Sequence, residues 1–246
     1  MVLILRVDCD NAYVSYGNNL MRKIRLVLNY LNENYFVPHV LSIGYLKHLY
    51  KFIEYLEDIG VHYSIFFKYI TLPPKDIVKI ITEKNEIGLH LYSAKTEKSF
   101  LKELKILENK INVKVEGFTK HGDGLVKLSR KHAWRYEPEK YIVWGMKAKL
   151  KYFSGNEHGI CSEIRIIKRK FLYIPQTFRV EPWARKTGGS IDDVVDHVST
   201  GGCTVALVHP CNWFTNETVQ RELENLLSKV QDVISFSLFL RRLSIN

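Results

Sequence analysis

The stretch Leu3-Ile4-Leu5-Arg6-Val7-Asp8-Cys9-Asp10 decides the fold of this chain. Residues 2–7 are apolar and β-prone apart from Arg6, which is typical of a central strand covered on both faces. Side chains alternate between the two faces of a strand, so the carboxylates of Asp8 and Asp10 are expected to point the same way, beyond the strand's carboxyl end. In sheets of parallel strands, functional sites are built at that edge.

Two carboxylates this close repel each other, and burying either without a partner is costly. A bound cation or a shared proton would resolve the repulsion, and a metal ion is the simplest candidate. The alternative is structural: Asp10 caps the following helix and Asp8 pairs with a lysine or arginine. An Asp-x-Asp motif alone does not decide between these interpretations.

The composition of the chain limits the classes of protein to consider. Its 246 residues are 46% hydrophobic, which is ample for one large α/β domain or two small ones. No apolar run approaches the ~20 residues that span a bilayer, and the first residues lack the features of a secretion signal, so we expect a cytoplasmic protein. The formal charge of +10 favours anionic partners. The four cysteines form no Cys-x-x-Cys pair, so neither a zinc knuckle nor a disulfide framework is indicated.

The spacing of apolar residues predicts helices and strands that alternate after the first strand. Such alternation is typical of parallel β/α units with right-handed crossovers. We therefore expect an α/β fold, a distorted (β/α) barrel, in one catalytic domain over residues 1–246. The segment 122–152 breaks the rhythm and is expected to be an irregular loop or insertion at the active site. The predicted helices cover 16–32, 45–59, 73–81, 98–111, 191–198 and 217–233, and the later predicted strands cover 38–43, 62–67, 86–91, 113–118, 164–174 and 204–208.

Polar residues stand where four of the predicted strands end. Asp8 and Asp10 close the first strand, and His90, His121 and His209 stand at the ends of three others. In a barrel these ends converge on one face, so residues distant in sequence would share one cavity. A mixture of histidine and carboxylate suits zinc or another divalent transition metal. Each histidine taken singly has an ordinary structural interpretation, as a satisfied core residue or a loop residue, and the joint pattern indicates a site.

The order of these short motifs resembles the polysaccharide deacetylase-like superfamily (NodB homology, carbohydrate esterase 4). The resemblance spans residues 3–213 and implies a metal-dependent hydrolase on a distorted (β/α) barrel of the NodB type. The implied reaction removes an acetyl group from an N-acetylated sugar or sugar conjugate. The motifs are Asp-x-Asp at 8–10, Gly-Leu-His-x-x-Ser at 88–93, Gly-Phe-x-x-x-Gly at 117–122 and Leu-x-His-Pro-x-x-Trp at 207–213.

The resemblance implies a role for each site residue. In the family's first motif the leading Asp is the general base, which maps onto Asp8, and the next acidic residue binds the metal, which maps onto Asp10. The histidine of the closing motif is the general acid and maps onto His209. Glu181 stands where the family has an Asp that orients this histidine.

The expected metal ligands depart from the family pattern in the second and third motifs. His90 matches the first histidine of the family's second motif, but the second histidine falls on Ala94, which cannot bind a metal. The third motif carries His121 where the family normally has no imidazole. We infer that His121 supplies the missing ligand, so that Asp10, His90 and His121 hold a divalent ion, expected to be Zn2+.

A mechanism follows from these roles. Asp8 takes a proton from the attacking water, which the metal activates, and His209 protonates the departing amine. Further cationic and aromatic residues are expected to line the cleft, as contacts for phosphates and sugar rings. These expected substrate-binding residues are Lys120, Lys127, Arg130, Trp134 and Trp213.

Two alternatives remain open at this stage. One is the hydrolysis of a non-sugar amide on the same scaffold. The other is a catalytically inactive relative that binds a polyanion or carbohydrate through its basic surface, with Ala94 marking lost metal binding. The sequence contains no helix-turn-helix, zinc-finger or RNA-binding aromatic signature, so nucleic acid is not expected as a partner. The expected partner is a small-molecule or oligosaccharide substrate, including an anionic one.

Overall fold

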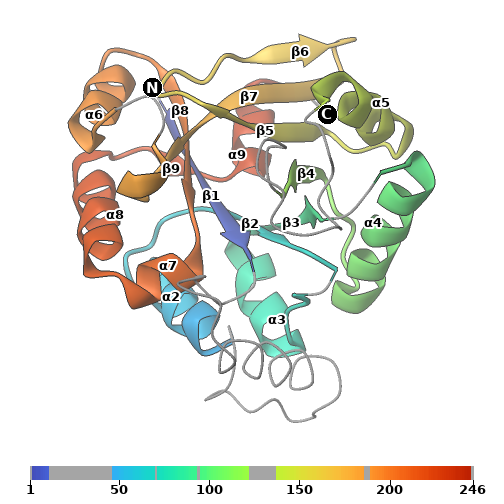
Figure 1. The fold of residues 1–246 in the computed structure, drawn as a ribbon, viewed down its shortest axis with the longest axis horizontal. Helices are drawn as coiled ribbons and strands as arrows, with labels where there is room; N and C mark the ends of the chain where they lie inside the picture. Colours follow the sequence, from blue (N-terminus) through green and yellow to red (C-terminus); the bar gives the residue numbers. More distant parts are fainter. Residues whose placement is uncertain are drawn as a thin grey trace.

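The computed structural model describes residues 2–10, 46–69, 71–92, 95–121, 137–185 and 189–244. Within these ranges nine strands form one sheet, and seven of them close into a parallel barrel in the order β1-β2-β3-β4-β5-β7-β8, with β8 pairing back to β1. The strands are β1 (Val2–Cys9), β2 (Ser64–Phe67), β3 (Glu86–Leu91), β4 (Gly117–Lys120), β5 (Tyr152–His158), β6 (Arg165–Ile167), β7 (Phe171–Arg179), β8 (Cys203–Val208) and β9 (Val233–Ile234). The predicted distorted (β/α) barrel is confirmed (Figure 1).

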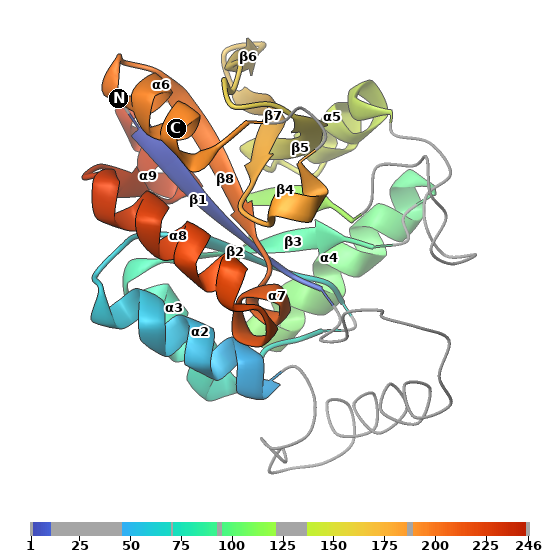
Figure 2. The ribbon, with the colours of Figure 1, turned by 60° about the vertical axis from the view of Figure 1, so that its left-hand side comes forward.

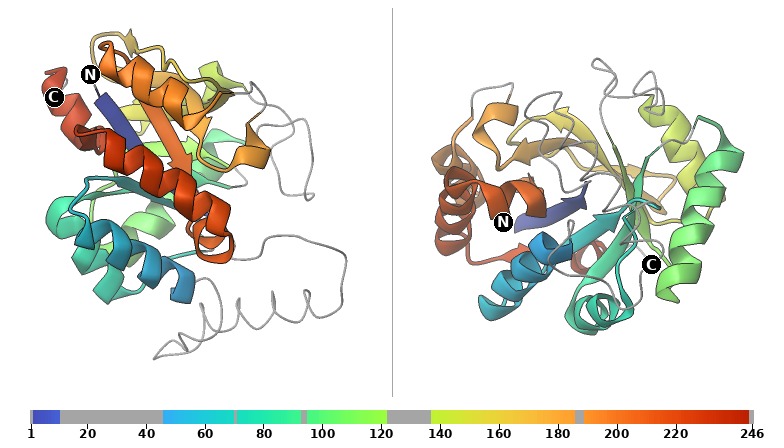
Figure 3. Two further views of the ribbon diagram at one scale, coloured as in Figure 1. Left: turned by 90° about the vertical axis from the view of Figure 1, so that its left-hand side faces the viewer. Right: turned by 60° about the horizontal axis from the view of Figure 1, so that its bottom comes forward.

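Helices surround the barrel on its outside (Figure 3). At the carboxyl end of β1, the short helix α7 packs against both α2 and α8 (Figure 2). Two strands lie outside the closed ring: β9 pairs with the first residues of β1, and β6 pairs antiparallel with β7. The helices are α2 (Leu46–Asp58), α3 (Lys75–Lys84), α4 (Glu97–Ile111), α5 (Pro138–Lys147), α6 (Ile191–Ser199), α7 (Pro210–Thr215), α8 (Glu217–Lys229) and α9 (Phe236–Arg242), with a 3-10 turn at Pro182–Ala184.

Three predictions of secondary structure are wrong. The strand expected at 113–118 begins only at Gly117, because Asn112 ends α4 in a left-handed conformation and residues 113–116 form an irregular connection. The second half of the segment expected to be irregular, 122–152, contains α5, which begins with Pro138 as its first residue. The single strand expected at 164–174 is a hairpin of β6 and β7, turned by two residues with positive φ, Lys168 and Arg169. The helix expected at 16–32 and the strand expected at 38–43 lie outside the described residues.

The barrel interior changes from apolar to charged along β1. Val2 and Ile4 belong to a buried cluster that joins strands from opposite sides of the barrel, while Leu3, Leu5 and Val7 pack in the other core, toward the helices. Further along β1, the inward positions are Arg6 and Asp8. The apolar layer stabilises the barrel at the amino ends of its strands and leaves polar side chains at the carboxyl ends. It consists of Val2, Ile4, Phe66, Tyr152, Leu172, Ile174, Val205, Ile234, Phe236, Phe239 and Leu240.

A buried carboxyl group ties this apolar layer together. The hydroxyl of Ser64 donates to Glu86 Oε2 at 2.7 Å, that of Tyr152 donates to Glu86 Oε1 at 2.8 Å, and the backbone N–H of Ser237 donates to Oε2 at 2.9 Å. Burial raises the pKa of Glu86 to about 7, although these hydrogen bonds act to lower it. Strands β2, β3 and β5 and the start of α9 therefore meet at a group that titrates near neutral pH.

The stability of the protein is expected to fall as Glu86 ionises. The folded protein holds the proton up to about pH 7, while the ordinary pKa of the group is 4.5, so its stabilising contribution is complete below pH 4.5 and is lost as the pH rises through about 7. Between pH 5 and pH 8 the loss should be about 2 to 3 kcal/mol. Urea unfolding of the wild type and of Glu86→Gln at pH 5 and pH 8 measures this loss of stability. The glutamine cannot ionise, so the pH dependence that only the wild type shows comes from Glu86. Glu83→Gln, on the exposed face of α3, is the matched control, and equal pH dependence in wild type and Glu86→Gln would contradict the prediction.

Candidate active site

Neighbouring strands of the barrel each end in an inward polar side chain. β1 pairs with β2, and β2 with β3, in a register that brings Asp10, Lys68 and His90 to one level if β1 and β2 are continued by one residue. His121 follows β4, the next strand of the barrel, and its backbone N–H donates to the carbonyl of Leu91 at the end of β3 at 2.8 Å. The carboxyl ends of four consecutive strands therefore meet at one place, as the barrel geometry predicts.

Asp10, His90 and His121 form a compact group of possible metal ligands. Asp10 Oδ1 lies 2.8 Å from His121 Nδ1 and 3.1 Å from His90 Nε2, and the two imidazole nitrogens are 3.1 Å apart. One ligand atom from each residue lies within 4.8 Å of the others. Around a zinc ion with bonds of ~2.1 Å, tetrahedral ligands are about 3.4 Å apart, so a small outward movement would fit these three to the ion.

The two histidines of this group are in the form that binds a metal. Burial lowers the pKa of His90 and of His121, against the opposing effect of the Asp8 and Asp10 carboxylates. Both imidazoles are therefore neutral at neutral pH, as ligation requires. His90 Nδ1 lies 2.6 Å from Thr119 Oγ1, and a proton on Nδ1 leaves the lone pair of Nε2 facing Asp10.

Lys68 joins the same group, although the sequence analysis did not identify it. Its Nζ lies 2.7 Å from Asp10 Oδ1, and its side chain is only 2% exposed. Burial acts to raise the pKa of Asp10, but its interactions with His121 and Lys68 hold this pKa well below its usual value. Lys68 directly follows the predicted strand 62–67, so the reasoning that singled out polar residues at strand ends applies to it as well.

Asp8 is held by Arg6, two residues earlier on the same strand. Arg6 Nε and NH2 donate to the two carboxylate oxygens at 3.0 Å and 2.6 Å, and both side chains are buried. Arg6 also donates to the carbonyl of Gly155 at 2.6 Å and to Asn156 Oδ1 at 2.8 Å, where a bulge in β5 shifts the strand register. Burial acts to raise the pKa of Asp8, but Arg6 outweighs it and keeps Asp8 ionised. The structural alternative, in which Asp8 pairs with an arginine, is therefore part of the observed site.

The partly buried His209 and the buried Glu181 form a second pair at the ends of β8 and β7. His209 Nδ1 lies 2.7 Å from Glu181 Oε1, which also accepts from the His209 backbone N–H at 3.0 Å and from Asn212 Nδ2 at 3.1 Å. The other ring nitrogen of His209 is 3.5 Å from Asp10 Oδ2, so the imidazole bridges Glu181 and Asp10. Burial acts to lower the pKa of His209, but Glu181 outweighs it and the pKa is raised. The contact from Asn212, in the first turn of α7, was not expected from the sequence.

Two residues expected to line the cleft are instead packed in the protein. Lys120 is 2% exposed, and its Nζ lies 5.8 Å from the centre of the Tyr141 ring. Trp213 is 9% exposed and packs on Phe52 and Tyr55, with ring centres 5.2 Å and 5.0 Å away. Helix packing around α2, α5 and α7 covers both side chains. This burial does not favour the contact with substrate that was expected for either of them.

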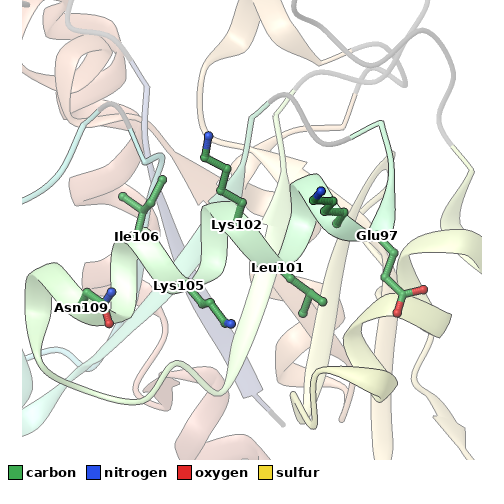
Figure 4. Close-up of a pocket in the computed structure, with 7 residues that line it drawn as sticks. Glu97, Leu101, Lys102, Lys105, Ile106 and Asn109 are labelled. Carbon is green, nitrogen blue, oxygen red and sulfur yellow. The ribbon is translucent and has the colours of Figure 1, made fainter.

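The other expected substrate contacts, Lys127, Arg130 and Trp134, lie outside the described residues, as does Ala94. A surface pocket of about 640 Å³ lies along α4, away from this group, and includes no residue of it (Figure 4). The pocket is lined by Glu97, Lys98, Leu101, Lys102, Lys105, Ile106 and Asn109. In the described part of the chain, no helix is both long enough and apolar enough to cross a bilayer.

Comparison with known proteins finds similarity of fold alone. No family model matches the sequence, and no curated protein matches it. The fold is similar to that of a 4-alpha-glucanotransferase from Thermococcus litoralis, with a TM-score of 0.56 and 11% identity over 98% of this chain and 38% of that one. This match establishes the barrel fold.

Two further structural matches have TM-scores below 0.5. One is the CE4 family pseudoenzyme BA3943 from Bacillus anthracis, with a TM-score of 0.47 and 12% identity over 97% of this chain. This chain spans 65% of the length of that protein. Another is a family 4 acetyl xylan esterase from Clostridium thermocellum, solved with a cobalt ion, with a TM-score of 0.48 and 12% identity over 100% of this chain and 93% of that one.

Proposed function

We propose that this protein is a metal-dependent hydrolase that removes an acetyl group from an N-acetylated sugar or sugar conjugate. The observation that carries the proposal is the convergence of one carboxylate oxygen and two neutral imidazole nitrogens, from Asp10, His90 and His121, at the carboxyl ends of neighbouring barrel strands. This set of donors suits Zn2+. When bound, the ion would supply the Lewis acidity that activates water and polarises the acyl carbonyl.

The protein's own groups supply the proton transfers in this proposal. Asp8 is ionised and held in one orientation by Arg6, and it accepts the proton of the attacking water. His209, whose pKa is raised, donates a proton to the departing amine. Glu181 fixes the ring of His209 through Nδ1, which leaves Nε2 directed toward Asp10 and the substrate.

The charge state of the carboxyl groups favours amide hydrolysis over glycosyl transfer, the reaction named for the glucanotransferase of similar fold. Most enzymes that cleave glycosidic bonds need one carboxylic acid with a raised pKa to protonate the leaving oxygen. In the described part of the site, the pKa of each candidate carboxyl is lowered by a cationic neighbour. The candidates are Asp8, Asp10 and Glu181, so histidine is the proton donor that this site offers.

Acetate release tests the proposal directly. Zinc-loaded protein is expected to release acetate from at least one member of a panel of N-acetylhexosamine compounds, with neutral and anionic members. Removing the acid in His209→Gln should reduce the rate roughly 10²- to 10⁴-fold, because general acid catalysis contributes that much. His62→Gln, which lies before β2 at the opposite end of the barrel, is the matched control and should keep the wild-type rate.

Each alternative predicts a different result. Stoichiometric metal with no acetate from any sugar would refute the sugar deacetylase and favour a non-sugar amide as the substrate. Absence of metal, together with tight binding of a polyanion or oligosaccharide, would refute the hydrolase and favour an inactive binding protein.

A further inference from the structure

We propose that Lys68 competes with the metal ion for Asp10, so that this lysine weakens metal binding and keeps the metal-free site intact. The inference rests on the proposed metal site and adds a residue that sets its affinity. When the ion binds, the ammonium group leaves Asp10.

Lys68 and the proposed metal ion would need the same oxygen of Asp10. Lys68 Nζ is 2.7 Å from Asp10 Oδ1, the atom that also faces His121 Nδ1 at 2.8 Å and His90 Nε2 at 3.1 Å. An ion held by Asp10, His90 and His121 would need this oxygen as its only carboxylate ligand from the group. The position that an ion must reach on Asp10 is therefore adjacent to an ammonium group.

The surrounding structure fixes Lys68 at this position. The backbone N–H of Lys68 donates to Thr71 Oγ1 at 3.1 Å, and the Thr71 hydroxyl donates to the carbonyl of Cys9 at 3.0 Å, next to Asp10. The side chain is 2% exposed and its Nζ lies 5.1 Å from the centre of the Tyr92 ring. A buried ammonium needs a counter-charge, and Asp10 provides it.

Electrostatics gives the direction of the effect. A divalent ion and an ammonium on the buried Oδ1 of Asp10 repel each other strongly, because solvent and salt screen buried charges poorly. Metal binding must therefore move Lys68 away from its counter-charge, and this displacement lowers the affinity. Without metal, the same ammonium keeps the Asp10 carboxylate paired and the site assembled.

Zinc affinity measured on the full chain tests the inference independently of activity. Lys68→Met should lower the Kd for Zn2+ roughly 10- to 100-fold, the range of effects seen for residues that contact metal ligands. Lys68→Arg keeps the charge and should stay close to the wild-type Kd. The matched control is Lys151→Met, which breaks the Lys151–Glu116 ion pair at the amino end of β5 and should leave the Kd unchanged.

The outcomes separate this inference from the proposed function. A Kd for Lys68→Met equal to or above that of the wild type overturns the inference, even if acetate is released. Failure of all four proteins to bind zinc overturns the metal site and, with it, the inference. If Lys68→Met does not fold, a structure of the zinc-loaded wild type decides: Lys68 Nζ is expected out of hydrogen-bond reach of Asp10, and a retained contact overturns the competition.

Discussion

Asp10→Asn is expected to lose its metal and to release acetate roughly 10³-fold more slowly than the wild type, a loss equivalent to about 4 kcal/mol of transition-state stabilisation. Asp10 carries the only carboxylate oxygen in the group of possible metal ligands, and that oxygen lies between both histidines. An amide oxygen is a much weaker ligand for zinc than a carboxylate. Metal content of the purified protein and the rate of acetate release are the two measurements.

Asp10→Asn also removes the counter-charge of the buried Lys68 ammonium. A control must therefore separate this electrostatic penalty from the loss of the metal ligand. The double variant Asp10→Asn/Lys68→Met removes this penalty, so it should fold at least as stably as the single variant and still bind no metal. Asp232→Asn, at a partly exposed ion pair with Arg242, controls for the substitution itself. Stoichiometric zinc in Asp10→Asn would show that the metal, if any, is held elsewhere.

Arg6→Met is expected to reduce the free energy of unfolding by about 3 to 5 kcal/mol, because it leaves the buried Asp8 carboxylate without its cation. The substitution also removes the hydrogen bonds from Arg6 to Gly155 and Asn156 at the bulge of β5. In the wild type, the lowered pKa of Asp8 contributes stability above its ordinary pKa of 3.8, and this contribution is lost as the pH falls through the lowered value. In Arg6→Met the carboxyl can take up a proton more easily, so the penalty should be smaller at mildly acidic than at neutral pH. Urea unfolding of the wild type and Arg6→Met at neutral and at mildly acidic pH measures this penalty.

Two further variants separate charge from packing at this position. Arg6→Met/Asp8→Asn removes both charges, and it should recover part of the lost stability. Arg242→Met breaks an exposed ion pair with Asp232 and should cost at most about 1 kcal/mol. An Arg6→Met protein as stable as the Arg242→Met control would show that the buried pair does not hold the barrel interior together.

The candidate site could be predicted as far as it depends on local patterns. The alternation along β1 and the polar residues after the predicted strands are properties of short segments. They were enough to select Asp8, Asp10, His90, His121 and His209, all of which the structure brings to one end of the barrel. Their roles in catalysis and metal binding stay predictions until the variants are measured.

The partners of these residues could not be predicted in the same way. Which cation faces Asp10 depends on the register between β1 and β2, and the acceptors that hold Arg6 beside Asp8 depend on the bulge in β5. Trp213 looked like a residue of the cleft because of its place in a motif, but packing against α2 buries it. Contacts of this kind arise only when the barrel closes.

The sequence by itself therefore determined the barrel and the end of it that carries chemistry, because strand periodicity and the change from apolar to polar residues are written in consecutive positions. Only the tertiary structure decided that Lys68 contacts Asp10, because the pairing of β1 with β2 brings these two residues together. In a buried site, charge balance depends on which side chains are within a few ångströms, and chain order does not specify that distance.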